Sequence, residues 1–346
     1  MKKPKPLIPL FKQFIKESES GKRLKKNGER ITKSSIDNYT YVLKNLILFS
    51  EETKTELRVC DILKLTKKEL LSEKNYWKKF YKNFTEFLYK KGCYDNYVGA
   101  TIKIIRVFFN YLKLEKDIYA GDFHKQFYVR KEEIDILVLS PEQLKYLIHD
   151  REFEEKLTPS LKRIKDIFVF GCTTGLRYSD IFLLTNKNFE QAGDDWYLKL
   201  KSKKTKTSSS IKLPVYAVAI YQKYRRKNSK LPLFIPITLF NFNKNLKQIG
   251  ELAEFTTPIA ISREKQGITK SIKSNKEKDR FCDKMSSHMM RRTAITTLLI
   301  LGMPEHLVRK ISGHSTASSS FNRYVHYAQV YIDREIDKIH SKLENY

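Results

Sequence analysis

The second half of the sequence carries basic and nucleophilic residues of types that suit chemistry on a phosphate ester. In chain order they are Arg177, Lys206, His288, Arg291, His314 and Tyr324. A phosphodiester is anionic, and the planar fork of a guanidinium matches two of its oxygens. Two arginines, a lysine, two histidines and a tyrosine could therefore hold the phosphorus, move protons and supply an attacking hydroxyl.

Taken singly, these residues say little. Arg177 lies in T-T-G-L-R-Y-S-D (173–180), and an isolated arginine is most often part of a structural salt bridge. Lys206 is one basic residue in a basic turn, K-T-K-T. H-M-M-R puts His288 and Arg291 one helical turn apart, a spacing that often occurs by chance. The information lies in their order along one stretch of chain.

This ordered set resembles the catalytic domain of the tyrosine recombinases, the phage integrase family. The resemblance spans about 140–335 and rests on T-G-L-R-Y-S-D, the lysine of the hairpin, S-H-M-M-R-R-T-A-I-T-T-L-L-I-L-G, V-R-K-I-S-G-H-S and R-Y-V-H. Near the N-terminus, K-R-L-K-K-N-G-E-R-I-T-K-S-S-I-D-N-Y resembles integrases of mobile elements in Bacteroidetes.

The resemblance implies a site-specific recombinase that integrates or inverts DNA by strand exchange. Tyr324 would attack the scissile phosphate and give a 3′-phosphotyrosyl link and a free 5′-hydroxyl. The bond energy is kept in that link, so no cofactor, ATP or metal is implied. Arg177 and Arg291 would bind the non-bridging oxygens, and Lys206 would protonate the leaving oxygen.

The remaining site residues would act around this exchange. His288 would help to activate the tyrosine or donate to the phosphate, and His314 would donate another hydrogen bond. Asp180 matches the acidic position after the first arginine of the family, and its implied role is to orient the neighbouring side chains.

The tyrosine stands one residue away from its place in the family pattern. In the family it lies nine residues after the Gly-His histidine, whereas Tyr324 lies ten after His314 and Arg323 occupies the usual place. An insertion in the loop S-T-A-S-S-S-F would account for this, because loops absorb added residues cheaply. Tyr327 and Tyr331 are alternative nucleophiles, although R-Y-V-H favours Tyr324.

The second half must position these side chains on a mainly helical framework. Ser140 and Pro141 predict a helix start, with serine as the N-cap and proline at the first position. The stretch 196–214 alternates on both sides of a polar turn and predicts a β-hairpin. The stretch 262–280 is polar and basic, which predicts a loop at the DNA surface. The resemblance implies a catalytic domain of α+β type over 140–346.

The first half predicts a compact helical bundle over 31–130. Ser34 or Ser35 offers the N-cap of a helix whose apolar face carries Ile36, Tyr39, Leu43, Leu46 and Phe49. Two further helices are predicted near 75–90 and 97–113, and their apolar stripes are most simply core. The resemblance implies that this bundle is a SAM-like core DNA-binding domain.

The segments at the ends and between the domains complete the expected organisation. Residues 1–30 form a short basic N-terminal segment, within which 8–17 could be helical, and 128–140 read as a linker. A last amphipathic helix is expected at about 328–346, with an apolar stripe of Val330, Ile332, Ile336, Ile339 and Leu343. That stripe either packs on its own domain or docks on a neighbouring protomer.

The charge balance points to a polyanionic partner. Lys and Arg number 67 against 39 Asp and Glu, for a formal charge of +28, and neutralisation of phosphates by such residues supplies most non-specific DNA affinity. A basic protein without a nucleic-acid role is the simpler alternative. The resemblance adds double-stranded DNA with specific sites, a homotetramer on that DNA and accessory DNA-bending proteins.

The cysteines and the hydropathy bear on location. Cys60, Cys93, Cys172 and Cys282 stand far apart without a C-x-x-C pair, which favours reduced cysteines over a zinc site or disulfides. No stretch approaches the roughly 20 apolar residues of a membrane span, and the N-terminus lacks the apolar core of a signal peptide. We expect a cytoplasmic bacterial protein associated with the nucleoid.

Two other functions compete with recombination. A type IB topoisomerase shares the chemistry but relaxes supercoils without a partner site. A catalytically inactive DNA-binding accessory protein would have no need for a tyrosine in this arrangement, and the full residue set therefore argues against it.

Overall fold

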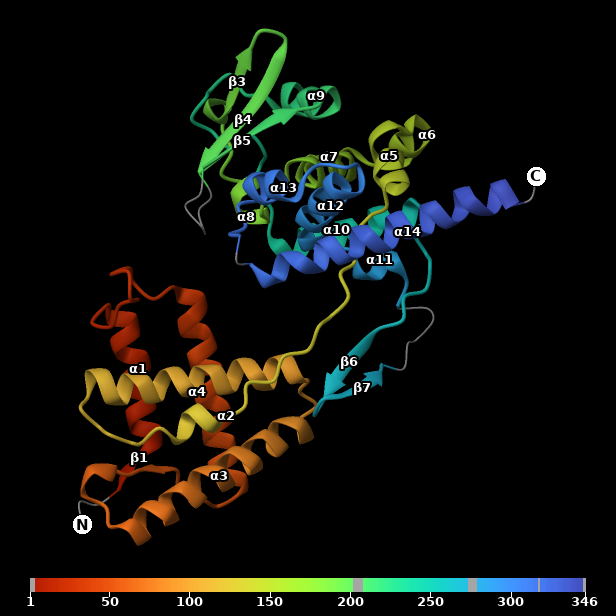
Figure 1. The fold of residues 1–346 in the computed structure, drawn as a ribbon. Coiled ribbons are helices and arrows are strands. Elements are labelled where there is room, and N and C mark those ends of the chain that lie inside the picture. The colour runs from red at the N-terminus through yellow and green to blue at the C-terminus, as the bar shows by residue number, and fades with distance from the viewer. Residues whose placement is uncertain (1–3, 202–207, 273–278, 317, 345–346) are drawn as a thin grey trace. The chain divides into compact units, whose positions relative to one another are not determined.

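The computed structural model describes residues 4–201, 208–272, 279–316 and 318–344. The chain folds into two compact units. The first comprises Met1–Ile134 and Ile261–Ile272, and the second comprises Asp135–Ala260 and Lys273–Tyr346. Helices dominate both units and the sheets are small, so the predicted fold class, mainly α with a small β-element, is confirmed (Figure 1). Among the described residues, no helix is both long and apolar enough to span a membrane.

The first unit is a helical bundle with an aromatic core. Its long helices are α1 (Leu7–Ser20), α2 (Lys33–Glu52), α3 (Lys67–Lys90) and α4 (Asp95–Glu115). Its short elements are β1 (Lys5–Pro6), β2 (Arg58–Val59), η1 (Ile62–Lys64) and η2 (Phe123–Gln126). Phe14, Phe84 and Phe108 are fully buried where the helices meet. Helix α1 thus belongs to this core, whereas the sequence had suggested a separate basic segment over 1–30.

Two helices of the bundle begin before their predicted starts. Helix α3 begins after Thr66, where the Glu69 carboxylate accepts the Thr66 N–H at 2.8 Å and the Thr66 hydroxyl accepts the Glu69 N–H at 3.4 Å. This capping box starts the helix upstream of the apolar stripe, where Leu71 is exposed and gives no periodic signal. Helix α2 likewise follows Thr32, not Ser34 or Ser35.

The stretch predicted as a basic loop contains a β-hairpin. β6 (Ser262–Lys265) pairs antiparallel with β7 (Ile268–Ser271), and Gln266 and Gly267 turn between them with positive φ. Every residue of β7 is exposed, so the strand carries no alternation that the sequence could have revealed. The loop prediction for 262–271 was therefore wrong.

Buried carboxylates of the bundle hold this hairpin in the first unit. Asp95 accepts the backbone N–H groups of Gln266 at 2.8 Å and of Gly267 at 2.7 Å. Glu132 accepts the guanidinium of Arg263, with Nη2 at 2.6 Å. The hairpin is thus fixed by polar groups, which explains why apolar patterning missed it.

In the second unit, further helices and a small sheet surround two central helices, α7 and α12. Its helices are α5 (Pro141–His149), α6 (Arg151–Lys156), α7 (Pro159–Thr174), α8 (Tyr178–Ile181), α9 (Val215–Tyr224), α10 (Leu239–Leu252), α11 (Phe281–Lys284), α12 (Ser287–Ile300), α13 (Glu305–Ser312) and α14 (Asn322–Glu344). The 3-10 helices are η3 (Asn186–Asn188) and η4 (Ser319–Phe321). Ser140 caps α5 with Pro141 at its first position, as predicted.

The predicted hairpin is present and gains a third strand. β3 (Phe189–Ala192), β4 (Asp195–Lys201) and β5 (Ser208–Leu213) form an antiparallel sheet in the order β3-β4-β5. Tyr197 pairs with Lys212 and Lys201 with Ser208. The alternating apolar residues Leu198 and Ile211 face the core.

Close contact between α7 and α12 fixes the framework of the second unit (Figure 1). A Cβ on Gly171 would lie 2.4 Å from Sδ of Met290 on α12, so a larger residue at this position would require the Met290 side chain to shift. This close approach fixes the end of α7, after which Arg177 follows, relative to the part of α12 that carries Arg291.

The last helix starts earlier than predicted. Helix α14 begins at Asn322, not near 328, so Tyr324 lies in its first turn. Its first half packs on α12 with Ala328 buried, and Val325 packs against a buried cluster of Ile295, Val308 and Phe321. Farther along, Ile336 is exposed. Packing on its own unit therefore accounts for the start of the helix, and docking of the rest on a neighbour stays a prediction.

Candidate active site

Arg177 stands where α7 ends. Gly175 takes a left-handed conformation with φ of 66° and caps α7 through its N–H to the Gly171 carbonyl. The chain then turns, and Arg177 becomes the N-cap residue of α8. Its guanidinium lies 3.9 Å from a carboxylate oxygen of the buried Asp180. Asp180 thus lies beside Arg177, and its role in orienting the side chains of the site stays a prediction.

Arg291 extends from the first turns of α12 across to two other segments. Its Nη1 donates to the Gly175 carbonyl at 3.0 Å, and its Nη2 donates to the Ser312 carbonyl at the end of α13. The side chain therefore ties the turn that carries Arg177 to the turn that carries His314. Burial, and then the charge of Arg177, lowers the pKa of Arg291 to about 10, which leaves it charged at neutral pH.

His314 follows the left-handed Gly313 that ends α13. Its Nδ1 lies 2.8 Å from the Ser312 hydroxyl and 3.3 Å from Nη2 of Arg291. Burial, and then the charges of Arg291, Arg177 and Arg309, lowers the pKa of His314 to about 4. The imidazole is therefore neutral at physiological pH.

Tyr324 is the tyrosine that contacts this group. Its ring centroid lies 5.9 Å from that of His314 and 5.8 Å from that of Phe321. Tyr324 also takes part in the electrostatic environment of Arg291. The predicted residues Arg177, Asp180, Arg291, His314 and Tyr324 are thus brought together from four separate segments of the second unit.

The alternative tyrosines have other surroundings. The Tyr331 hydroxyl donates to Glu142 on α5 at 2.9 Å. Burial, and then this hydrogen bond, raises the pKa of Tyr331 to about 12. Burial also raises the pKa of Tyr327. A raised pKa makes a phenol a poorer source of phenolate, which disfavours attack by Tyr327 and by Tyr331.

The two remaining predicted residues are placed less fully. His288 lies on α12 one turn before Arg291, as the H-M-M-R spacing predicted, and its side chain is exposed. Lys206 lies outside the described residues, between β4 and β5 in the chain.

Sequence reasoning missed two neighbours of the site, Ser312 and Arg309. Ser312 contacts His314 directly, and it stands immediately before the Gly-His pair, where its closeness in the chain was the available signal. Arg309 is buried and contacts the loop that follows His314. Nothing in V-R-K-I-S-G-H distinguishes this arginine from the many basic surface residues of the chain.

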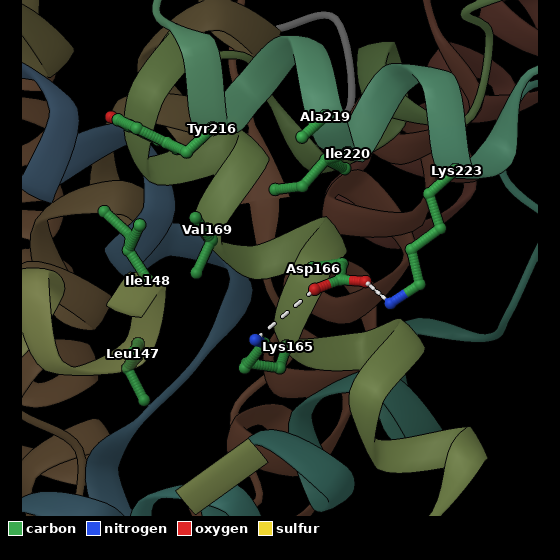
Figure 2. Close-up of a pocket in the computed structure, with 9 residues that line it drawn as sticks. All are labelled: Leu147, Ile148, Lys165, Asp166, Val169, Tyr216, Ala219, Ile220 and Lys223. Carbon is green, nitrogen blue, oxygen red and sulfur yellow. Dashed lines mark hydrogen bonds and ion pairs between the residues drawn. The ribbon is translucent and has the colours of Figure 1, made fainter. Parts of the chain in front are cut away.

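A pocket of the second unit lies away from these residues. It has a volume of about 210 Å³, lies between α5, α7 and α9, and is lined by Leu147, Ile148, Lys165, Asp166, Val169, Tyr216, Ala219, Ile220 and Lys223 (Figure 2). Asp166 pairs there with Lys223 at 2.7 Å and with Lys165 at 3.5 Å. None of the predicted site residues lines it. Within the described residues, no group of three or more His, Cys, Asp or Glu is placed to hold a metal ion.

A family model matches the segment that carries this site. The model for the phage integrase family matches residues 138–330, more than half of the chain. The chain belongs to the phage integrase family. All residues of the site, from Arg177 to Tyr324, lie within the matched segment.

Solved integrase-family structures share the fold. The chain aligns with the XerH site-specific recombinase bound to a palindromic difH substrate at 14% identity and a TM-score of 0.61, covering 97% of each chain. It aligns with the Tn1549 transposon integrase in complex with transposon right-end DNA at 15% identity and 0.58, covering 95% and 99%. A lambda integrase tetramer bound to a Holliday junction matches at 12% and 0.60, covering 93% and 78%. No curated protein matched the chain.

Proposed function

We propose that this chain is a site-specific DNA recombinase that cleaves and rejoins strands through Tyr324, of the integrase or invertase type. The observation that carries the proposal is the contact series from Arg291 through His314 to Tyr324, at 3.3 Å between nitrogens and 5.9 Å between rings. A phosphate bound there would meet fixed donors on one side and a phenol on the other, and donors fixed in advance need no reorganisation during the reaction.

The reaction follows from the chemistry of these groups. The Tyr324 oxygen attacks the phosphorus, the bond to the 5′-oxygen breaks, and the tyrosine stays linked to the 3′-phosphate. Arg177 and Arg291 offset the charge that develops on the non-bridging oxygens. Removal of one such donor typically costs 10²–10³ in rate. Neutral His314 donates a hydrogen bond to the phosphate without adding charge. His288 lies beside Arg291 on the same helix. Lys206 protonates the leaving oxygen.

The reverse step rejoins the strands. A free 5′-hydroxyl attacks the phosphotyrosyl link, and Tyr324 leaves as the phenol. When that hydroxyl comes from a second DNA molecule, the strands are exchanged. Exchange at two sites requires several protomers on two duplexes, so we propose a homotetramer on double-stranded DNA that carries specific sites. Accessory DNA-bending proteins and action in the bacterial cytoplasm, at the nucleoid, are part of this proposal. The formal charge of +28 supports a DNA partner.

The experiment that tests the function is a reaction between two supercoiled DNAs that carry the flanking sequences of the gene. A recombinase gives products that join the two molecules. Relaxed DNA without joined products would instead indicate a topoisomerase of the same chemistry. Binding without strand breakage would indicate an inactive DNA-binding accessory protein.

A further inference from the structure

The segment that joins His314 to α14 is small and mostly polar from Ser315 to Ser320, so it can bury little apolar surface to offset its ordering entropy. Its own hydrogen bonds run from the Ser318 N–H to the Ser315 carbonyl and from the Phe321 N–H to the Ser318 carbonyl, both at 3.1 Å. Contacts that reach the segment from outside add to these bonds and to the packing of α14 in setting the position of Tyr324.

Arg309 of α13 supplies such contacts at both ends of the loop. Its Nη1 donates to the Ser315 carbonyl at 3.0 Å, and its Nη2 donates to Oδ1 of Asn322 at 3.2 Å. Its Nε donates to Glu305 at 2.7 Å, on the preceding turn of the same helix. The side chain is only 11% exposed. A planar guanidinium that makes these three hydrogen bonds fixes Ser315 and Asn322 relative to one another.

Arg309 also fixes the aromatic side chain that lies between the two site residues. Its guanidinium carbon lies 4.1 Å from the centroid of the Phe321 ring. Phe321 is fully buried, and its ring lies 5.3 Å from that of His314 and 5.8 Å from that of Tyr324. Displacement of Phe321 would therefore move the ring contacts of both residues.

We propose that Arg309 is a positioning residue that fixes the loop from Ser315 to Asn322 and thereby holds Tyr324 opposite His314. This inference rests on the recombinase function proposed above. Arg309 acts through Phe321 and Asn322, not by touching the phosphate.

The test measures single-turnover cleavage of a nicked suicide substrate together with DNA affinity and melting temperature. Arg309→Lys keeps the charge but loses the fork, and Asn322→Ala removes one acceptor at an exposed position. We expect both to slow cleavage roughly tenfold or more with unchanged DNA affinity, because displacement by about 1 Å can cost about 10²-fold. Lys310→Arg is the matched control, since Lys310 is the exposed neighbour of Arg309 on α13, and it should cleave at the wild-type rate.

A substrate with sulfur in place of the leaving 5′-oxygen separates positioning from acid catalysis. Its leaving group needs no protonation, so Lys206→Ala should be rescued on it, whereas Arg309→Lys and Asn322→Ala should stay slow. Wild-type cleavage by both loop variants, or their rescue by the sulfur substrate, would overturn the role of Arg309. If the wild-type protein forms no adduct on Tyr324, the proposed function itself fails. If Arg309→Lys lowers the melting temperature, Asn322→Ala decides the outcome.

Discussion

Nη2 of Arg291 lies 3.3 Å from Nδ1 of His314. A guanidinium carries donors only, so Nδ1 must be the acceptor and the imidazole proton must sit on Nε2. The Ser312 hydroxyl lies 2.8 Å from the same nitrogen and donates to the Arg309 carbonyl at 3.3 Å. This leaves the Nε2–H group of a neutral His314 as the donor available to a substrate oxygen.

Neutral His314 has a measurable titration. Its pKa is lowered to about 4 by burial and by the charges of Arg291 and Arg177, against about 6.5 in the unfolded chain. Its contribution to stability is thus fully present above about pH 6.5 and is lost as the pH falls through about 4. Imidazole NMR should give the low pKa, and Arg177→Gln should raise it while Arg292→Gln should not. A wild-type value near 6.5 would contradict this environment.

Substitution of Arg177 or Arg291 should affect DNA cleavage and DNA affinity to different extents. Arg177→Ala should retain DNA affinity and lose cleavage by roughly 10²–10³. Arg291→Ala should lose cleavage and also stability, because the Gly175 and Ser312 carbonyls lose their donor. Gel-shift affinity, single-turnover cleavage and thermal melting would be measured on both. If Arg177→Ala lost only affinity, Arg177 would be a clamp residue.

The packing of α7 on α12 should tolerate no side chain at Gly171. Gly171→Ala would bring Cβ to 2.4 Å from Sδ of Met290, and overpacking of this kind costs about 1–3 kcal/mol. Denaturant unfolding should show this loss. Because the clash is with Met290, Gly171→Ala should cost less when combined with Met290→Ala than in the wild-type background, and simple additivity of the two changes would refute that cause.

Glu132 should stabilise the hairpin of the first unit. Burial alone would raise the pKa of Glu132, but hydrogen bonds from Arg263, Glu264 and Asn96 outweigh it and lower that pKa. The stabilisation is therefore present above the ordinary carboxyl range and is lost at lower pH. Glu132→Gln should lower the unfolding free energy by about 1–3 kcal/mol and expose residues 262–271 to proteases. The exposed Glu133 offers the control Glu133→Gln, and equal effects would refute the role of Glu132.

The sequence predicted those helices and strands whose apolar residues recur at a regular spacing along the chain. Apolar stripes located the helices around Phe84 and Ile102, and alternation located the strands with Leu198 and Ile211. The sequence did not predict elements that depend on polar interactions. The start of α3 depends on the Thr66–Glu69 box, and the β6–β7 hairpin depends on carboxylates of Asp95 and Glu132 that lie far away in sequence.

The site was predictable as an ordered set of residue types but not as a geometry. The spacing of H-M-M-R places two residues on one turn, and the helix confirms this for His288 and Arg291. The roles of Ser312 and Arg309 depend on the left-handed turn at Gly313 and on the start of α14 at Asn322. One buried arginine among 67 basic residues leaves no trace in composition.

The nucleophile itself is tested most directly by mapping the covalent peptide after reaction with a nicked suicide substrate. We predict one phosphotyrosyl adduct, on Tyr324, that is abolished in Tyr324→Phe and retained in Tyr327→Phe and Tyr331→Phe. An adduct on Tyr327 or Tyr331, or no adduct on any tyrosine, would contradict the central claim.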